Sequence, residues 1–279
     1  MSAAATLDAG WRQRLAARLD APPEAPRVAL RVAIGAAAVS APIGSIEAPL
    51  AWRLAAAGHP LRDVGAHWQI ELPNAAALAP ALAAIAQWLH ANRVATGWRD
   101  ELLAVDDAAG ERVGAIERAA VRPLGIATRA VHLVVCDARG QVWVQQRAFD
   151  KATDPGCWDT TMGGLVSADE SIAQTLRRET WEEAGLRLDA LRELARFGRF
   201  TVRRPVADGY MVEHIEMFEA RAPEGMTPQN QDGEVERFEC LAVAALVERL
   251  HAEAFTREAA MILARWLDHR HGRSASASV

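Results

Sequence analysis

The sequence predicts an α+β protein with a smaller domain over residues 1–125, a larger one over 126–272 and a disordered tail at 273–279. The chain has 279 residues, and 51% of them are hydrophobic. This is enough for one large domain or two modest ones. Helical and strand periodicities mix in the first part, whereas strand patterns dominate from Ala130 onward. The segment Arg122–Gly125 separates the two patterns and marks the expected boundary.

In the first domain, alanine-rich amphipathic periodicity predicts helices, and short runs of strand-forming residues predict strands between them. The expected helices are Leu7–Leu19, Ser45–Ala57 and Asn74–Ala95. The expected strands are Ala29–Ile34, His67–Leu72 and Glu101–Val105, followed by a turn and the segment Val113–Val121. We therefore expect a small α+β unit of its own.

In the second domain, the segments Ala130–Cys136 and Gln141–Arg147 predict a hairpin around a DARG turn. A long loop follows and ends at Gly163 and Gly164, which makes a functional loop more plausible than a simple connection. The remaining expected elements are a helix at Ser171–Ala184, strands at Leu194–Arg204 and Tyr210–Arg221, and helices at Leu241–Ala252 and Thr256–His269.

The helix expected at Ser171–Ala184 carries an unusual charge cluster. Glu179, Glu182 and Glu183 fall within an arc of about 100° near its C-terminal end. The i, i+4 repulsion costs roughly 0.2–0.5 kcal/mol, and the helix dipole disfavours each anion in the last turn by about 0.3–1 kcal/mol. A divalent cation such as Mg²⁺, which prefers oxygen ligands, would offset both costs. On charge pattern alone, a solvated acidic face explains the cluster equally well.

The spacing of glycine and charged residues around this helix resembles the Nudix box, the signature of hydrolases that cleave a nucleoside diphosphate linked to another group. The matching positions are Gly164, Glu170, Arg178, Glu179, Glu182, Glu183, Gly185 and Leu186. One position departs from the family pattern, because Thr180 stands where the family usually has an aliphatic residue. This difference affects only the expected packing of the helix on its sheet. The resemblance implies an α/β/α sandwich with a mixed sheet.

The resemblance also implies roles for individual residues. Glu179, Glu182 and Glu183, with the carbonyl of Gly163, are expected to hold Mg²⁺, with Mn²⁺ as the alternative cation, and Arg178 is expected to orient the carboxylates. A downstream acid, Glu234 or Glu236, is expected to serve as a further ligand or as the general base, and a solvated acidic turn is the competing interpretation. Arg147 and Lys151 are expected to contact substrate phosphate, with a structural ion pair as the alternative for Arg147.

A narrower resemblance lies between Ile116 and Leu186. The stretches IERAAVRPLGIATRAVHL and WVQQRAFDKATDPGCWDTTMGGLV resemble the Nudix subgroup with an extra N-terminal domain. This subgroup is related to the N-terminal, hydrolase half of fungal thiamin pyrophosphokinases and to plant chloroplast Nudix proteins. The resemblance implies hydrolysis of thiamin diphosphate, or of its oxidised or damaged forms, to the monophosphate and phosphate.

Three other functions compete with this one. Hydrolysis of nucleoside diphosphate derivatives such as ADP-ribose remains the main alternative, because the box does not select the leaving group. Isopentenyl diphosphate isomerase is disfavoured, since that chemistry needs a cysteine where this chain has Gly163 and a histidine where it has Leu165. A non-catalytic nucleotide-sensing module is disfavoured because such domains usually lose box glutamates, and this chain keeps them all.

Composition limits the partners. The net charge is −5 and no basic run occurs, which argues against nucleic acid and leaves a small-molecule diphosphate as the expected partner. No apolar run approaches the ~18 residues of a membrane span, and the N-terminus lacks the pattern of a signal peptide. We therefore expect a cytoplasmic enzyme without a membrane partner, and a homodimer is compatible with the sequence.

Overall fold

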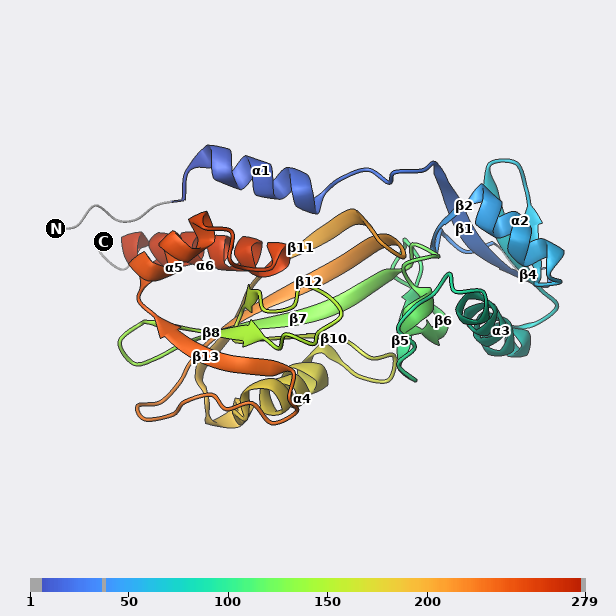
Figure 1. Ribbon diagram of the computed structural model, residues 1–279. Helices are drawn as coiled ribbons and strands as arrows, with labels where there is room; N and C mark the ends of the chain where they lie inside the picture. Colours follow the sequence, from blue (N-terminus) through green and yellow to red (C-terminus); the bar gives the residue numbers. More distant parts are fainter. Residues whose placement is uncertain (1–6, 37–38, 277–279) are drawn as a thin grey trace.

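The computed structural model describes residues 7–36 and 39–276, and it has the predicted α+β architecture (Figure 1). Within these ranges the strands form a four-stranded sheet, a seven-stranded sheet and a two-stranded hairpin. The seven-stranded sheet is mixed and has helices on both faces, so the predicted α/β/α sandwich is confirmed. No helix in the described ranges is long and apolar enough to cross a membrane.

The four-stranded sheet belongs to the N-terminal part of the chain and has its own hydrophobic core. Its order is β2 (Gly44–Glu47), β1 (Arg27–Ile34), β4 (His67–Leu72) and β3 (Leu61–Asp63). The accompanying elements are α2 (Ala48–Ala56), η1 (Ala75–Ala77), α3 (Leu78–Ala91) and the hairpin of β5 (Leu102–Asp106) and β6 (Arg112–Glu117). The helix expected at Ser45–Ala57 begins only at Ala48, because the preceding residues pair with β1 and Pro49 suits a first helical turn.

The first helix, α1 (Ala9–Leu19), does not join this sheet. It packs on α6 (Arg257–Ser276) and β11 (Arg192–Val206), and Figure 1 shows it lying along α6. Leu15 is 6% exposed within the same core as the buried Trp266 of α6. The expected boundary at residue 125 therefore does not separate the two cores, because the apolar stripe of α1 is buried against the second one.

The seven-stranded sheet forms the centre of the sandwich. Its main order is β11, β12 (Gly209–Arg221), β7 (Ala127–Cys136), β8 (Val142–Arg147) and β13 (Val235–Leu241), while β10 (Met162–Leu165) pairs with β7 and β9 (Trp158–Asp159) pairs with β8. One face packs against α4 (Ile172–Ala184). The other face is covered by α1, α5 (Val243–His251) and α6 (Figure 1).

The two central strands diverge, and this creates the space for a site. β7 and β8 pair only through Val135 with Trp143 and Cys136 with Val142. Away from these pairs, β10 pairs antiparallel with β7, and β9 pairs antiparallel with β8. The opening between the strands therefore lies beside the two glycines of β10.

Helix α4 follows the predicted start and end. Ser171 caps it in a reciprocal capping box with Gln174, and Gly185 ends it at a φ of 61° in the left-handed region. Thr180 is fully buried, and its hydroxyl donates to the carbonyl of Leu176 at 2.5 Å. The unusual residue of the box is thus accommodated, because the carbonyl one turn earlier satisfies its hydroxyl.

Two C-terminal expectations differ from the structure. The acidic segment expected as a loop around Glu234 and Glu236 enters strand β13 at Val235. The sequence does not reveal this strand, because burial does not alternate along it, its register shifts between Val235 and Arg237, and several of its side chains are charged. Helix α6 continues to Ser276, four residues into the tail expected at 273–279, and residues 277–279 lie outside the described ranges.

The docking of α1 is testable through Leu15→Ala. Removing this buried side chain should lower the free energy of unfolding by about 2–4 kcal/mol, because it leaves a cavity between α1 and α6. Urea unfolding measures the change, and the exposed Gln13→Ala on the same helix is the matched control. Equal stabilities of the two variants would show that α1 does not contribute to the second core.

Candidate metal and substrate site

A cleft of about 250 Å³ opens where β7 and β8 diverge. One end is formed by α4 and the glycines of β10. The loop 151–154 and Glu234 also line the cleft. The far end lies beside the start of β7 and is lined by β12, the start of α6 and arginines from residues 99–122. The segment before the second sheet therefore contributes side chains to the same cleft as the box helix.

Glu183 is the most deeply buried carboxylate of the site, with 3% of its surface exposed. Its Oε2 accepts hydrogen bonds from the backbone N–H of Gly163 at 3.0 Å and from Nε2 of Gln145 at 2.9 Å. Burial, reinforced by the nearby Glu179, raises the pKa of Glu183 to about 8 despite these two bonds. The site thus holds a carboxyl group whose negative charge lacks a cationic partner.

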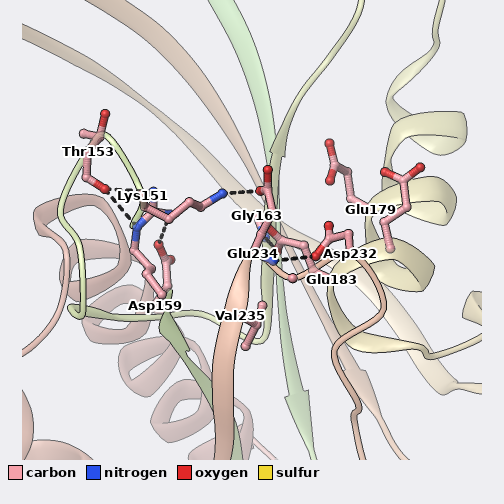
Figure 2. Close-up of polar contacts among 12 residues, drawn as sticks. Lys151, Thr153, Asp159, Gly163, Glu179, Glu183, Asp232, Glu234 and Val235 are labelled. Carbon is pink, nitrogen blue, oxygen red and sulfur yellow. Dashed lines mark hydrogen bonds and ion pairs between the residues drawn. The ribbon is translucent and has the colours of Figure 1, made fainter. Parts of the chain in front are cut away.

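Glu179 lies one helical turn earlier, against Gly164. A Cβ on Gly164 would lie 2.2 Å from the Glu179 carboxyl carbon, so only glycine allows this approach. Burial raises the pKa of Glu179 to about 7, although the adjacent Arg178 opposes the shift. Figure 2 shows Glu179 and Glu183 near Gly163.

Arg178 holds three carboxylates at once. Its guanidinium donates to both oxygens of Glu170 at 2.8 Å, and its Nη1 donates to Glu179 and to Glu182 at 2.9 Å each. The Glu170 carboxylate, followed by the other two, raises the pKa of Arg178 further above its ordinary value. These contacts would allow Arg178 to orient the carboxylates, the role expected for it from the sequence.

Two of the predicted acids lie outside the cleft lining. Glu182 has 42% of its side chain exposed and is held by Arg178. Glu236 is exposed on β13. Each is displaced from the cleft by local geometry: Glu182 sits on the Arg178 side of α4, and the exposed Glu236 lies at the register shift between Val235 and Arg237.

Glu234 does line the cleft, and it forms an ion pair with Lys151 (Figure 2). Burial alone would raise the pKa of Glu234, but the Lys151 ammonium and the more distant Arg118 and Arg147 outweigh it and lower the pKa. Arg147 donates to the carbonyl of Thr153 at 3.0 Å and contacts Asp159 at 3.4 Å. Both predicted phosphate-contacting cations therefore face the cleft while paired within the protein.

The structure does not assemble the three box glutamates around one point. Across the described residues, no three carboxylate, imidazole or thiol side chains are grouped closely enough to hold a metal ion together. Arg178 draws Glu182 away, and Lys151 holds Glu234.

The residues nevertheless fit a hard divalent cation. Glu183 is buried and the neighbouring Glu179 is largely buried, and burial raises the pKa of both. Of the two, only Glu179 has a cationic partner, Arg178, which it shares with two other acids. Oε1 of Gln145, beside Glu183, is buried without a hydrogen-bond partner among the described residues. Oxygen donors with unbalanced negative charge are the ligands that Mg²⁺ and Mn²⁺ prefer.

Several contributors to the site were not anticipated from the sequence. They are Gln145, Asp159, Arg118, Arg122, Arg204, Glu213 and Glu258. The signal for Gln145 is its place in the apolar strand pattern VWVQQR, because a polar side chain that is buried in a sheet needs a hydrogen-bond partner. In the structure Gln145 is 2% exposed and Glu183 is that partner. The others are brought together by strand pairings that no local pattern reveals.

A model of the NUDIX domain family matches residues 127–263. These residues are a Nudix domain. The matched range begins at the first residue of β7 and ends within α6, so it contains the whole seven-stranded sheet. The expectation of a Nudix domain preceded by an extra N-terminal region is confirmed, and the Nudix family is one of pyrophosphohydrolases.

Individual relatives share this domain. The chain is 38% identical over 97 residues to an uncharacterized Nudix hydrolase of Pseudomonas aeruginosa, covering 35% of this chain and 57% of that protein. It is 29% identical over 204 residues to the chloroplastic Nudix hydrolase 20 of Arabidopsis thaliana, covering 69% of this chain and 52% of that protein. The crystal structure of DR0079 from Deinococcus radiodurans aligns at 25% identity with a TM-score of 0.49, covering 59% of this chain and 98% of that one. The chain spans about half the length of these curated relatives.

The buried Glu183 makes the metal-free Nudix domain sensitive to pH. Its pKa is raised from 4.5 to about 8 on folding, so the unfolded state loses its proton first as pH rises. This group's contribution therefore lowers stability between about pH 4.5 and pH 8. Thermal melts in a chelator should show the decline, and Glu183→Gln should flatten it.

Added Mg²⁺ should oppose the same decline, so its stabilising effect should be larger at about pH 9 than at about pH 5. The exposed Glu248→Gln on α5 serves as the control and should behave as the unaltered protein. A pH profile unaffected by Glu183→Gln would contradict the placement of an unpaired acid at this position.

Proposed function

We propose that this protein is a hydrolase of organic diphosphates that depends on a divalent cation. The observation that carries the proposal is the pair of α4 carboxylates that face a cleft in a Nudix domain, the buried Glu183 and the largely buried Glu179. Glu183 has no cationic partner and Glu179 shares Arg178 with two other acids, so a cation would balance their charge, and a diphosphate supplies the remaining oxygen ligands. The alternative of a solvated acidic face does not account for carboxylates with this degree of burial.

In this proposal, Glu179, Glu183 and the carbonyl of Gly163 hold Mg²⁺ or Mn²⁺. Such a cation supplies positive charge to the phosphoryl oxygens and to the attacking water. Glu182 acts from outside the cleft, by sharing Arg178 with Glu179 and fixing its position.

The protein's own residues handle the substrate and the proton. Arg147 and Lys151 exchange their internal partners for phosphate oxygens, which frees Glu234 at the edge of the cleft. Glu234 takes the proton of the attacking water, because the buried acids are occupied as ligands. The water oxygen bonds to phosphorus, the bridging P–O bond breaks, and the products are an organic monophosphate and phosphate.

The substrate that we propose is thiamin diphosphate or an oxidised or damaged form of it. The support is the resemblance of residues 116–186 to the thiamin-related Nudix subgroup, together with the similarity to the Arabidopsis Nudix hydrolases 20 and 24. The N-terminal region, which contributes arginines to the cleft, is consistent with a subgroup defined by that extra region.

The approach of Glu179 to Gly164 gives a structural test of the proposed chemistry. Gly164→Ala should reduce kcat by about 10²-fold or more, because the added methyl group displaces the Glu179 carboxylate from its position. Phosphate release measures kcat, and Gly272→Ala is the matched control, since a Cβ there meets nothing within 4 Å. A normal kcat in Gly164→Ala would show that the position of Glu179 does not matter for the proposed hydrolysis.

A diphosphate panel tests the reaction and the substrate separately. Purified protein should release phosphate from thiamin diphosphate only with Mg²⁺ or Mn²⁺, and kcat/KM should exceed that for ADP-ribose and nucleoside diphosphates. A reversed ranking would end the thiamin proposal while keeping the hydrolase. No release from any member with either cation would refute the hydrolase itself.

A further inference from the structure

The far end of the cleft contains a carboxylate that the proposed chemistry does not use. Glu213 lies on β12, where its Cα pairs with Thr128 of β7 on one side and with Val202 of β11 on the other. Its side chain lines the same cleft as Glu179 and Glu183. It therefore lies in the same cavity as the box glutamates, away from the helix that carries them.

Glu213 has an incomplete set of partners. Thr128 donates a hydroxyl hydrogen bond to its Oε2 at 3.2 Å. Among the described residues, no arginine, lysine or histidine nitrogen lies within the 4.0 Å ion-pair distance of its carboxylate. Burial, with help from the neighbouring Glu258, raises its pKa against the opposing effects of Thr128, Arg122 and Arg118.

The nearby arginines are already paired with other carboxylates. Arg204 binds Glu258 at 3.1 Å, with 13% of each side chain exposed. The two remaining pairs are Arg122 with Asp208 at 3.4 Å and Arg118 with Glu101 at 2.7 Å. Arg118, Arg122 and Arg204 are therefore committed to other acids, and Arg99, which also lines the cleft, is not within ion-pair distance of Glu213. Among the described residues, Glu213 is left without a cationic partner.

Building on the proposed function, we propose that Glu213 binds a positively charged nitrogen group on the organic part of the diphosphate substrate. A diphosphate held at the α4 end places its organic part toward the other end of the cleft. A cation there gives Glu213 the ion pair that the protein does not supply, and desolvation strengthens this pair. A neutral or anionic organic group leaves the half-buried carboxylate without a cation and is disfavoured.

Glu213 is thus a specificity-determining residue, and Thr128 is its positioning residue. The substrate class is a diphosphate ester whose organic part carries a quaternary or protonated nitrogen. Thiamin, with its cationic thiazolium ring, is a probe of this class, whereas isopentenyl diphosphate is a probe without a cation.

The test compares Glu213→Gln with unaltered protein on these two probes. The amide keeps the Thr128 hydrogen bond but loses the charge, so kcat/KM for thiamin diphosphate should fall by about tenfold or more. The kcat/KM for isopentenyl diphosphate should not fall and is expected to rise, because the neutral amide no longer disfavours an uncharged organic group, and this shifts the ratio of the two. Glu248→Gln on the exposed face of α5 should leave both values unchanged.

Equal losses on both probes would overturn the inference, because they would indicate a structural role. An unchanged ratio would overturn it as well. If Glu213→Gln does not fold, Glu213→Asp replaces it: the charge is kept but withdrawn by one methylene, and a selective loss on thiamin diphosphate is again expected.

A binding measurement separates this inference from the proposed hydrolysis. Thiamin without phosphate should bind the metal-free protein in calorimetry. Glu213→Gln should weaken this binding and raise the Kd by about tenfold or more. If no diphosphate is cleaved, the hydrolase proposal fails while this result still supports a cation subsite. Absence of Glu213-dependent thiamin binding would overturn the subsite.

Discussion

The placement of negative charge without a matching cation is the constraint on which the site depends. Glu183 is buried and Glu179 is largely buried at the end of α4, where the helix dipole and their mutual repulsion both oppose ionisation. The protein stabilises them only partly: a backbone N–H and Gln145 reach Glu183, and Arg178 reaches Glu179. The protein thus gives up stability at the place where, in our proposal, a cation binds.

The rest of the fold positions this charge. Because β7 and β8 separate after two residue pairs, α4 carboxylates on one face of the sheet reach a cleft that extends to the other face. The glycines of β10 permit the approach, since a side chain at Gly163 would meet the His132 ring and one at Gly164 would meet Glu179. The region before β7 closes the far end with Arg118 and Arg122, so the Nudix domain and the preceding segment share one site.

The sequence predicted what is local and missed what is formed by distant contacts. The capping of α4 by Ser171, its end at Gly185 and the acidic cluster all depend on residues within one helix, and the helix bounds were confirmed. The docking of α1 on α6 could not be predicted, because an amphipathic stripe does not specify which core buries it. The separation of Glu182 from the cleft depends on the direction of one guanidinium, and the isolation of Glu213 depends on the pairing of Arg118, Arg122 and Arg204 with other acids.

The ion pair of Lys151 with Glu234 joins two segments that line the cleft. Lysine here acts as an internal counter-ion that keeps Glu234 charged before any ligand arrives. In the proposed reaction, an arriving phosphate takes over the ammonium and releases the carboxylate in the same event, so the proton acceptor becomes available only when there is a substrate to hydrolyse. One contact between opposite charges replaces another in this exchange.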